Sequence, residues 1–366
     1  MRFSDDAWQI AKIGDVLTIE RGGSPRPIQN FVTRRLDGIN WIKIGDTSDD
    51  GYIYSAKEKI IPEGAKRSRK VKAGDLLLSN SMSFGKPYIL KIDGCIHDGW
   101  LVIRDIDSKF NKEFLRNYLG SSFCISQYKK LAAGGVVTNL NKDLVCSAII
   151  KYPPIASQEK IASFLCILDE KIRTQNKIIK ELETYKSAIE NMIFKSINFP
   201  LFAIGDLCKI TTGKLDANAT VSGGMYRFYT CAANYTYIDK YAFDCDAVLI
   251  SGNGANVGYV HQYNGKFNAY QRTYVLYDFA NITSTYLRFF LEKYLKQRIN
   301  SEKNNGNTPY IRLETISKMK IGVPDQNKQN LIVNALLAIT SKIDNEQKLL
   351  ENFYNQKRFL LANLFI

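Results

Sequence analysis

Two long segments of the chain share one pattern of apolar positions. In the first, apolar residues recur three and four positions apart, at Ile161, Leu165, Leu168, Ile172, Ile179, Leu182, Ile189 and Ile193. The second segment repeats this register 171 residues further on, at Ile332, Leu336, Ile339, Ile343, Leu350, Phe353, Leu360 and Leu364. An average period of 3.5 residues is typical of a coiled-coil seam, and this one is longer than an ordinary globular helix needs.

Two polar residues interrupt each seam, again at matching positions. They are Gln175 and Lys186 in the first segment and Glu346 and Lys357 in the second. We expect the two helices to pair antiparallel, which would bring Gln175 near Lys357 and Lys186 near Glu346. Buried polar residues of this kind can fix the register of a coiled coil. The alternative is that each helix folds back on its own preceding segment.

The internal repeat continues outside the helices. Each copy has an Ile-Gly-Asp near its start, a strand-like run ending in serine, a second short strand, and a loop rich in Gly, Asn or Thr. The pairs are Ile13–Asp15 with Ile204–Asp206, Asp75–Ser79 with Asp246–Ser251, Leu101–Asp105 with Tyr274–Asp278, and Ala132–Leu140 with Asn304–Leu313. Short alternating runs with a turn signal every ~8–12 residues predict mainly β domains with a few helices.

Proline and capping residues mark the starts of the long helices. Pro153–Pro154 and Pro324 break the preceding elements, and Ser157 and Asp325 suit helix N-caps. We therefore expect a first head at 1–153, a long helix at 154–198, a second head at 199–325 and a second long helix at 326–366. The predicted fold class is α+β: two mixed, mainly β heads joined by two long antiparallel coiled-coil helices, with an internal pseudo-twofold repeat.

Composition adds a partner to this picture. The formal net charge is +14 and the pI is about 9.3, a surplus that favours a polyanion such as nucleic acid. The chain has no apolar run of membrane-spanning length and no signal-peptide pattern at its start, so we expect a cytoplasmic protein.

Candidate chemistry for catalysis is sparse. Seven cysteines lie far apart without C-x-x-C spacing, and only two histidines accompany them, which argues against a zinc site. No phosphate-binding loop is present. The run Tyr152–Ile155 resembles an amino-methyltransferase motif but has tyrosine where a carboxamide is needed, and the glycines around Asn253 precede a strand rather than a helix. We expect a chain without its own active site.

Basic, amide and aromatic side chains in loops are the positive signal, because Lys and Arg neutralise phosphates while Asn, Gln and Arg can read base edges. In the first head the candidates for DNA contact are Arg26, Arg34, Arg35, Lys66, Arg67, Arg69, Lys70, Asn80, Ser81, Lys86 and Asn139. In the second head they are Asn253, Asn256, Gln271, Arg272, Lys303, Asn304, Asn305, Tyr310 and Arg312.

Taken in order, these features resemble a specificity subunit of a type I DNA restriction–modification system. The likeness lies in the two Ile-Gly-Asp copies, the serine-ended strands followed by glycine, and the loops GGVVTNL and NGNTPYIRL. Its most telling segment is PPIASQEKIASFLCILDEKI, at 153–172, a proline-led start to the first long helix. The ordered set covers nearly the whole chain.

The resemblance implies two target-recognition domains that each read one half of a split, asymmetric DNA site. It implies that the helices set the gap between the halves and dock two methyltransferase subunits, with restriction subunits as further partners. S-adenosylmethionine, ATP and Mg²⁺ would then belong to the partner subunits, and this chain would hold no cofactor, no metal and no catalytic residue.

Some features depart from the family pattern. The second helix start has Pro324-Asp325 and Gln329-Asn330 where the first has paired prolines and Gln-Glu. The alternative interpretations are a partnerless bipartite DNA-binding protein, a scaffold whose basic patches contact acidic protein, and, more distantly, a metal-dependent nuclease. Loss of DNA affinity on substituting Arg67 and Arg69 would exclude the scaffold.

Overall fold

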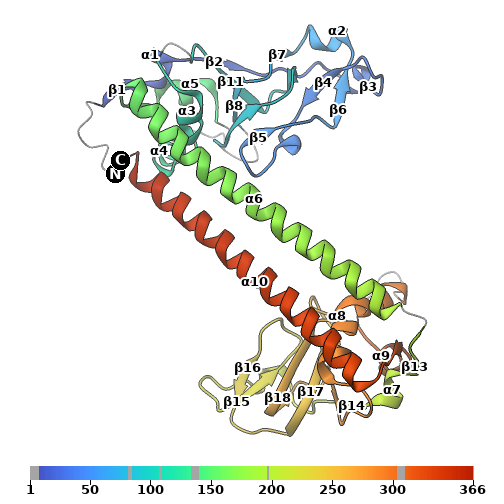
Figure 1. Ribbon diagram of the computed structural model, residues 1–366. Helices are drawn as coiled ribbons and strands as arrows, with labels where there is room; N and C mark the ends of the chain where they lie inside the picture. Colours follow the sequence, from blue (N-terminus) through green and yellow to red (C-terminus); the bar gives the residue numbers. More distant parts are fainter. Residues whose placement is uncertain are drawn as a thin grey trace. The chain divides into compact units, whose positions relative to one another are not determined.

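The computed structural model describes residues 8–80, 85–106, 109–132, 140–195, 198–302 and 310–365. The chain forms two compact units: unit 1 is Met1–Lys177 with Gln347–Ile366, and unit 2 is Ile178–Glu346. Both long helices, α6 (Ile155–Phe194) and α10 (Gln326–Asn363), begin in one unit and end in the other (Figure 1). The α+β class and the two repeated heads with long helices are therefore as predicted.

Unit 1 contains two five-stranded sheets that pack on each other. The inner sheet has the order β2-β11-β8-β9-β5, with bounds Thr18–Arg21, Trp100–Arg104, Leu76–Ser79, Pro87–Leu90 and Tyr52–Ile53. The outer sheet has the order β3-β6-β4-β10-β7, with bounds Val32–Thr33, Glu58–Ile60, Ile39–Ile42, Gly94–Ile96 and Arg69–Val71. Because side chains alternate along a strand, Leu77 and Val102 face the outer sheet while Leu76, Leu78 and Leu101 face the helices.

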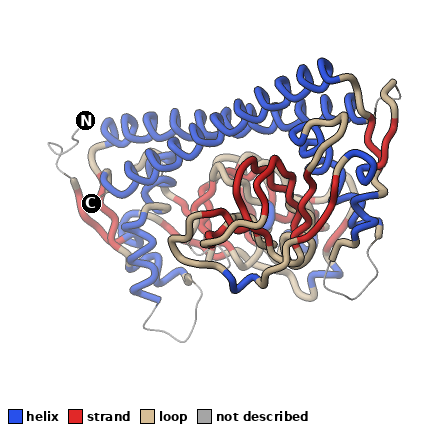
Figure 2. The backbone as a smooth tube through the Cα atoms, turned by 90° about the horizontal axis from the view of Figure 1, so that it is seen from below, coloured by secondary structure: helices blue, strands red, loops and turns tan. Residues whose placement is uncertain are grey.

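Short helices cover the other face of the inner sheet and carry the unit's polar contacts. They are α1 (Ile13–Val16), α3 (Lys112–Leu119), α4 (Ser122–Ala132) and α5 (Lys142–Ser147), while α2 (Pro62–Ala65) lies in the outer sheet's region. A two-stranded antiparallel ladder of β1 (Gln9–Lys12) and β12 (Ile149–Tyr152) joins the start of the head to the start of α6 (Figure 2).

Unit 2 repeats the helix-covered half of this plan with a single sheet. Its order is β14-β19-β17-β18-β15-β16, with bounds Lys209–Thr212, Thr273–Tyr277, Phe243–Ser251, Val260–Ala269, Tyr226–Tyr229 and Thr236–Ile238. One face packs on α8 (Ser284–Ser301) through Val248, Ile250 and Leu276. The other face gathers Tyr229, Leu249, Phe267 and Val275, and no second sheet covers it among the described residues.

The repeated Ile-Gly-Asp starts a short helix that packs closely on another in each unit. In unit 2 this helix is α7 (Ile204–Leu207), which lies against α9 (Leu313–Ser317) next to the ladder of β13 (Leu201–Ala203) and β20 (Lys320–Gly322). A Cβ added at Gly14 would lie 2.8 Å from Cys146 Cβ, and one at Gly205 would lie 3.1 Å from Ser317 Cβ. Glycine is therefore needed at this position for the close approach of two helices.

A buried glutamine fixes the start of each long helix. Gln158 is 0% exposed; its Nε2 donates to Pro153 O at 2.9 Å and Lys109 O at 3.0 Å, and its Oε1 accepts from Asn111 N at 3.0 Å. Gln329, also 0% exposed, makes the corresponding three bonds to Pro324 O, Asn281 O and Thr283 N. The second helix start is thus built like the first, despite its different prolines.

The predicted seam is buried in each unit. Ile161, Leu165, Leu168, Ile172, Gln175, Ile179, Leu336 and Ile343 are buried, and Leu182, Lys186, Ile332, Ile339, Glu346, Leu350, Phe353 and Lys357 are half-buried. Within unit 1, Lys357 pairs with Asp169, and Lys171 Nζ lies 5.8 Å from the ring centre of Phe353, so the helix segments run antiparallel there. The helices are therefore paired rather than folded separately onto their own heads.

The register of that pairing differs from the predicted one. The prediction put Lys357 near Gln175, but its ion-pair partner is Asp169, six residues earlier on α6 and about 9 Å away along the helix. Lys186 pairs with Glu190 and Glu346 with Lys342, each on its own helix. The prediction failed because polar seam residues were matched only with one another, whereas Lys357 meets an acidic residue held by the head.

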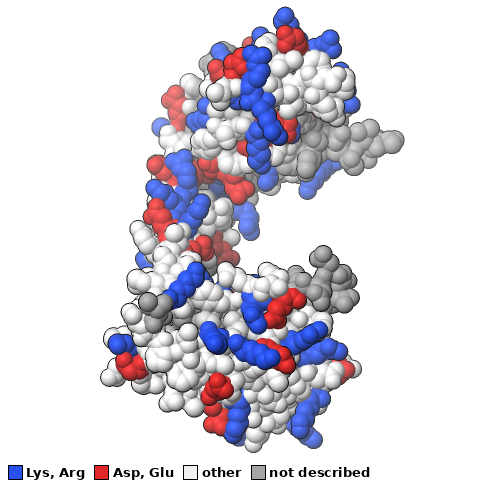
Figure 3. Space-filling model, turned by 90° about the vertical axis from the view of Figure 1, so that its right-hand side faces the viewer, with Lys and Arg blue, Asp and Glu red and all other residues white. Residues whose placement is uncertain are grey.

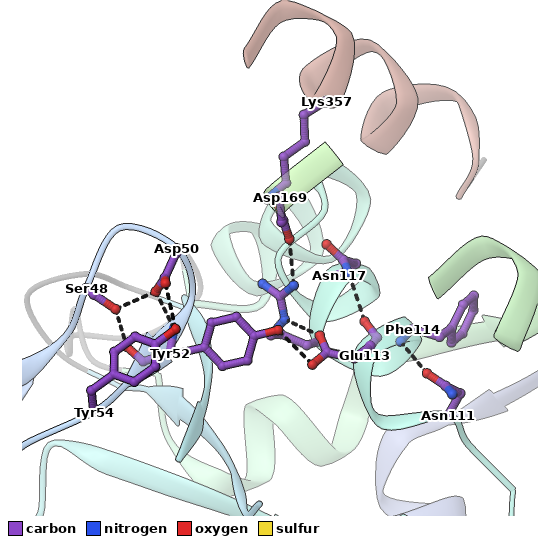
Figure 4. A network of polar contacts seen from close by, with 11 residues as sticks. Ser48, Asp50, Tyr52, Tyr54, Asn111, Glu113, Phe114, Asn117, Asp169 and Lys357 are labelled. Atoms are coloured by element: carbon purple, nitrogen blue, oxygen red, sulfur yellow. Dashed lines mark hydrogen bonds and ion pairs between the residues drawn. The ribbon is translucent and has the colours of Figure 1, made fainter. Parts of the chain in front are cut away.

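Arg116 on α3 is the residue of the head that binds Asp169. Its Nη2 donates to Asp169 Oδ2 at 2.7 Å and its Nε to Glu113 Oε2 at 2.8 Å, while Tyr52 Oη donates to Glu113 at 2.8 Å (Figure 4). Burial alone would lower the pKa of Arg116, but Glu113 and Asp169 raise it overall, so the guanidinium stays charged. The network ties the inner sheet, α3, α6 and α10 together within unit 1.

Candidate nucleic-acid interface

An open groove of about 1280 Å³ in the first head could hold a ligand. It runs between a loop at 24–29 and the strands β3, β4 and β6. Its floor includes the buried Trp41, and basic and apolar side chains share its walls. The lining residues are Ser24, Pro25, Arg26, Pro27, Ile28, Gln29, Val32, Thr33, Arg34, Trp41, Lys43, Glu58, His97 and Asp98.

Asp98 organises the charges on one wall of the groove. Ser24 Oγ donates to it at 2.8 Å, and Arg26 Nη2 donates at 3.2 Å. Burial alone would raise the pKa of Asp98, yet these two donors hold it below its usual range. Arg34 is exposed and has no ion-pair partner among the described residues. Two of the predicted DNA-contact residues, Arg26 and Arg34, therefore line one groove. Arg26 is paired with Asp98, whereas Arg34 has no carboxylate partner among the described residues.

The other predicted basic residues of the first head divide into paired and unpaired groups. Arg35 pairs with Asp37 at 2.7 Å, and Arg69 pairs with Glu20 at 3.3 Å. Arg67 lies over the ring of Phe31, 5.4 Å from its centre, and Lys66 and Lys70 are exposed. None of these five lines the groove, and their contact with DNA stays a prediction.

Asn80 lies at the end of β8 but faces the protein. It is 5% exposed, its Nδ2 donates to Asp98 O at 2.8 Å, and its carbonyl accepts from Leu140 N at 3.0 Å. A base contact by this amide would require breaking the bond to the groove wall. Lys86 is exposed beside Ser48 and Asp50, away from the groove. Ser81 and Asn139 lie outside the described residues.

In the second head the predicted residues gather at one end of the sheet. Asn253 forms a bridge with Tyr310, Asn256 Nδ2 donates to Cys231 O at 3.3 Å, and Arg272 O accepts from Gly252 N at 2.9 Å. Gln271 N donates to Leu215 O in the next loop. The loops at 231, 253–256, 271–272 and 310 therefore form one surface.

One more predicted residue of the second head, Arg312, belongs to the same region. Arg312 Nη2 donates to Tyr310 Oη at 3.0 Å, and this hydrogen bond raises the pKa of Arg312. Next to it, Ile311 N donates to Gly252 O at 2.8 Å, as Leu140 N donates to Asn80 O in the first head. Lys303, Asn304 and Asn305 lie outside the described residues.

An aromatic cluster around Arg227 was missed at the level of the sequence. It occupies the uncovered face of the second head's sheet, where Arg227 on β15 lies over the rings of Tyr235 and Tyr263 at 4.3 and 4.4 Å. The three residues are far apart in the chain, and only the strand order β18-β15-β16 brings them together. The abundance of tyrosine was the one available signal.

On the one face of the molecule that Figure 3 draws, positive charges are dispersed rather than concentrated. On the face drawn in Figure 3, Lys and Arg side chains lie among Asp and Glu on both units. Among the described residues, no three His, Cys, Asp or Glu side chains gather in a way that could hold a metal ion, and no helix is both long and apolar enough to cross a membrane. Contact residues must therefore be chosen from local geometry.

The helix pair of unit 1 exposes an apolar surface. Phe164, Ile167 and Phe359 are 51%, 56% and 68% exposed and line a groove of about 320 Å³ with Leu168, Lys171, Gln356 and Leu360. The corresponding positions in unit 2 carry alanine, at Ala335, Ala338 and Ala188. The two copies of the repeat therefore differ at these three positions.

The chain is similar to known proteins over its full length. A family model described as the type I restriction modification DNA specificity domain matches residues 5–184 and 197–352. The EcoDI specificity subunit of Escherichia coli is 37% identical over 170 residues, which is 46% of this chain and 37% of that protein. The HindI specificity subunit of Haemophilus influenzae is 24% identical, over 62% of this chain and 54% of that protein. This chain thus spans about half or less of these two relatives' lengths.

Longer matches are more distant. The MjaIX specificity subunit of Methanocaldococcus jannaschii is 22% identical over 93% of this chain and 88% of that protein. The solved S subunit from M. genitalium has the same fold, with a TM-score of 0.65 and 14% identity over 100% of this chain and 98% of that one. The chain therefore belongs to the family of type I restriction–modification DNA specificity proteins.

Proposed function

We propose that this chain is the non-catalytic DNA-recognition subunit of a type I restriction–modification complex, and that each head reads one half of a split, asymmetric site. The observation that carries the proposal is that the two heads have matching backbone elements but expose different side chains. Leu140 N donates to Asn80 O at 3.0 Å and Ile311 N donates to Gly252 O at 2.8 Å, so the same backbone bond recurs at matching places of the two heads. Around these bonds, one head has a basic groove and the other an aromatic sheet face.

The chemistry of both surfaces suits double-stranded DNA. Arg34 in the groove, and Arg272 and Arg312 on the second head, can neutralise phosphates or donate to base acceptors, while Arg26 and Lys43 are already paired with carboxylates. Amide side chains such as Asn253 and Gln271 can both donate and accept at adenine. Different residue types at matching places would give the two heads different sequence preferences.

The long helices are proposed to set the gap between the two half-sites. A helix of 40 residues such as α6 is about 60 Å long. Its seam residues Ile161, Leu165, Leu168, Ile172 and Ile179 are buried, and a buried seam resists bending. A stiff connection would make the gap a fixed number of base pairs rather than a range.

The exposed apolar groove around Phe164 and Phe359 is proposed to dock one of two methyltransferase subunits. Large exposed apolar side chains next to one another mark interaction surfaces, and aromatic residues carry much of the energy of such contacts. Restriction subunits would join through that complex. S-adenosylmethionine, ATP and Mg²⁺ would act in those partners, in the cytoplasm where the DNA lies.

The test is to co-express the chain with its methyltransferase subunit and to map methyl-adenine across a host genome by single-molecule sequencing. The expected result is one split motif, of which one half changes when residues 199–325 are exchanged for those of another family member. A purified complex that methylates no specific motif would overturn the proposal. Specific DNA binding by the chain alone, without a complex, would instead indicate a partnerless DNA-binding protein.

A further inference from the structure

Arg227 is held in place by aromatic rings rather than by a carboxylate. Its guanidinium carbon lies 4.3 Å from the ring centre of Tyr235 and 4.4 Å from that of Tyr263, and its Nη1 donates to Tyr229 Oη at 3.4 Å. Among the described residues no Asp or Glu forms an ion pair with it, and its Nε and Nη2 have no protein partner. Tyr235 and Tyr263 therefore pack against the guanidinium, while its Nε and Nη2 donors are open.

This environment differs from that of most arginines in the first head. Arg26, Arg35, Arg69 and Arg116 each pair with a carboxylate, which uses the donor edge that DNA would need. Stacking on aromatic rings leaves that edge free and orients the planar guanidinium. An arginine fixed in this way loses little conformational freedom when it binds, which raises both affinity and selectivity.

The Arg227 cluster is continuous with the loop surface of the second head. The ring of Tyr229 lies 5.1 Å from that of His261, and a His261 ring nitrogen lies 3.1 Å from Ala232 O. The adjacent Cys231 carbonyl accepts the Asn256 side chain. The open sheet face and the loops around Asn253 and Arg272 therefore form one surface of unit 2.

We propose that Arg227 is a specificity-determining residue of the second head and reads a guanine in the major groove of its half-site. The Arg fork matches guanine O6 and N7 bidentately, and this is the commonest base-specific contact of arginine. Tyr235 and Tyr263 are positioning residues that hold the fork. This inference rests on the proposed function, since it assigns one contact within the half-site that the second head would read.

The experiment uses the complex of this chain with its methyltransferase subunit and a duplex carrying the mapped motif. Guanines of the second head's half-site are replaced one at a time by 7-deazaguanine, which lacks the N7 acceptor. At one position the substitution should weaken binding by the wild-type complex by roughly 5- to 150-fold, the range of a bidentate base contact. The same substitution should have no effect on the complex with Arg227→Ala, which has no donor, and a smaller effect on that with Arg227→Lys, since lysine keeps the charge and a donor but has no fork.

Lys318→Ala is the matched control, because it removes one exposed positive charge from the same head. It should leave the 7-deazaguanine effect intact. If no guanine couples to Arg227, or if Arg227→Ala weakens cognate and unrelated DNA by equal factors, Arg227 contacts the backbone and the inference is wrong. A wild-type complex without any preferred duplex would overturn the proposed function itself, and this inference with it. Circular dichroism of both Arg227 variants separates these results from misfolding.

Discussion

Gln158 and Gln329 each bridge three backbone groups. One is the carbonyl of a proline just before the long helix, and the other two lie just before α3 or α8. A buried amide can both donate and accept, and it satisfies these groups without introducing charge. The recurrence of this arrangement in both heads shows that the repeat extends to single hydrogen bonds.

Replacing Gln158 with leucine should therefore destabilise unit 1. Leucine has a similar volume but takes the partner from Pro153 O, whose bond is buried, and from Lys109 O and Asn111 N, whose bonds are partly buried. A buried group without a partner costs about 1–3 kcal/mol and groups near water cost less, so we expect the free energy of unfolding to fall by about 2–4 kcal/mol. Urea titration of the purified chain measures this change. Gln347→Leu, at an exposed position of α10, should change it by less than ~0.5 kcal/mol, and equal losses in the two variants would contradict the role given to Gln158.

The direction of a polar side chain was the hardest feature to predict from the sequence, as Asn80 and Arg227 show. Asn80 sits in a loop at a strand end, as a base-reading residue would, yet it is buried against Asp98. Arg227 reads as an ordinary strand residue, because its stacking partners depend on a parallel pairing of β15 with β18 that local patterns do not encode.

The connection of each head to its helices differs between the two copies. In unit 1, Arg116, Asp169 and Lys357 form a buried ion network. In unit 2 the matching positions are Arg288, Thr340 and Lys186, and Thr340 Oγ1 donates only to Leu336 O on its own helix. Arg288 is 3.7 Å from Glu292 on its own helix instead. An apolar pattern predicts the helix and its seam, but not a bond between elements that lie far apart in the chain.

Asp169→Ala should therefore cost more than its counterpart Thr340→Ala. Removing Asp169 leaves Lys357 without its ion-pair partner and Arg116 with Glu113 alone, and breaking a buried pair is strongly destabilising. We expect a loss of about 2–4 kcal/mol for Asp169→Ala and less than about 1 kcal/mol for Thr340→Ala. Chemical denaturation of both variants gives the comparison. Similar losses would mean that the network contributes nothing beyond helix packing.

The exposed apolar groove of unit 1 belongs to the surface of the helix pair rather than to its core. Substituting Phe164 and Phe359 together with alanine should lower affinity for the methyltransferase subunit by about 30-fold or more, since each buried aromatic anchor contributes above ~1 kcal/mol. Both rings are largely exposed in the free chain, so its unfolding free energy should change little. Surface plasmon resonance with the immobilised chain measures the affinity. Leu36→Ala, at a fully exposed site on the first head, is the control, and an unchanged affinity in the double variant would place docking elsewhere.

At the scale of the whole molecule, one frame is used twice with different surfaces. The frame was predictable, because a period of 3.5 residues, repeated glycines and proline-led helix starts are local signals. The surfaces were only partly predictable, since the second sheet of the first head and the open aromatic face of the second depend on strand order. The register between the two long helices was predicted wrongly for a similar reason. Lys357 on α10 pairs with Asp169 on α6, and Asp169 is also bound by Arg116 on α3, which is far away in the sequence.

If the helices set the gap between half-sites, lengthening both by one heptad should lengthen the gap without changing what either head reads. The insertions go between Lys177 and Ile178 in α6 and between Glu346 and Gln347 in α10, where the chain passes from one unit to the other. Seven residues keep every seam position in register and add about 10.5 Å, which corresponds to about three base pairs at 3.4 Å each. Methylome sequencing should then show the original half-sites separated by a gap about three base pairs longer. A four-residue insertion in α6 alone shifts one seam against the other and should abolish methylation. If the seven-residue variant methylates the original motif with its original gap, the helices do not act as the spacer.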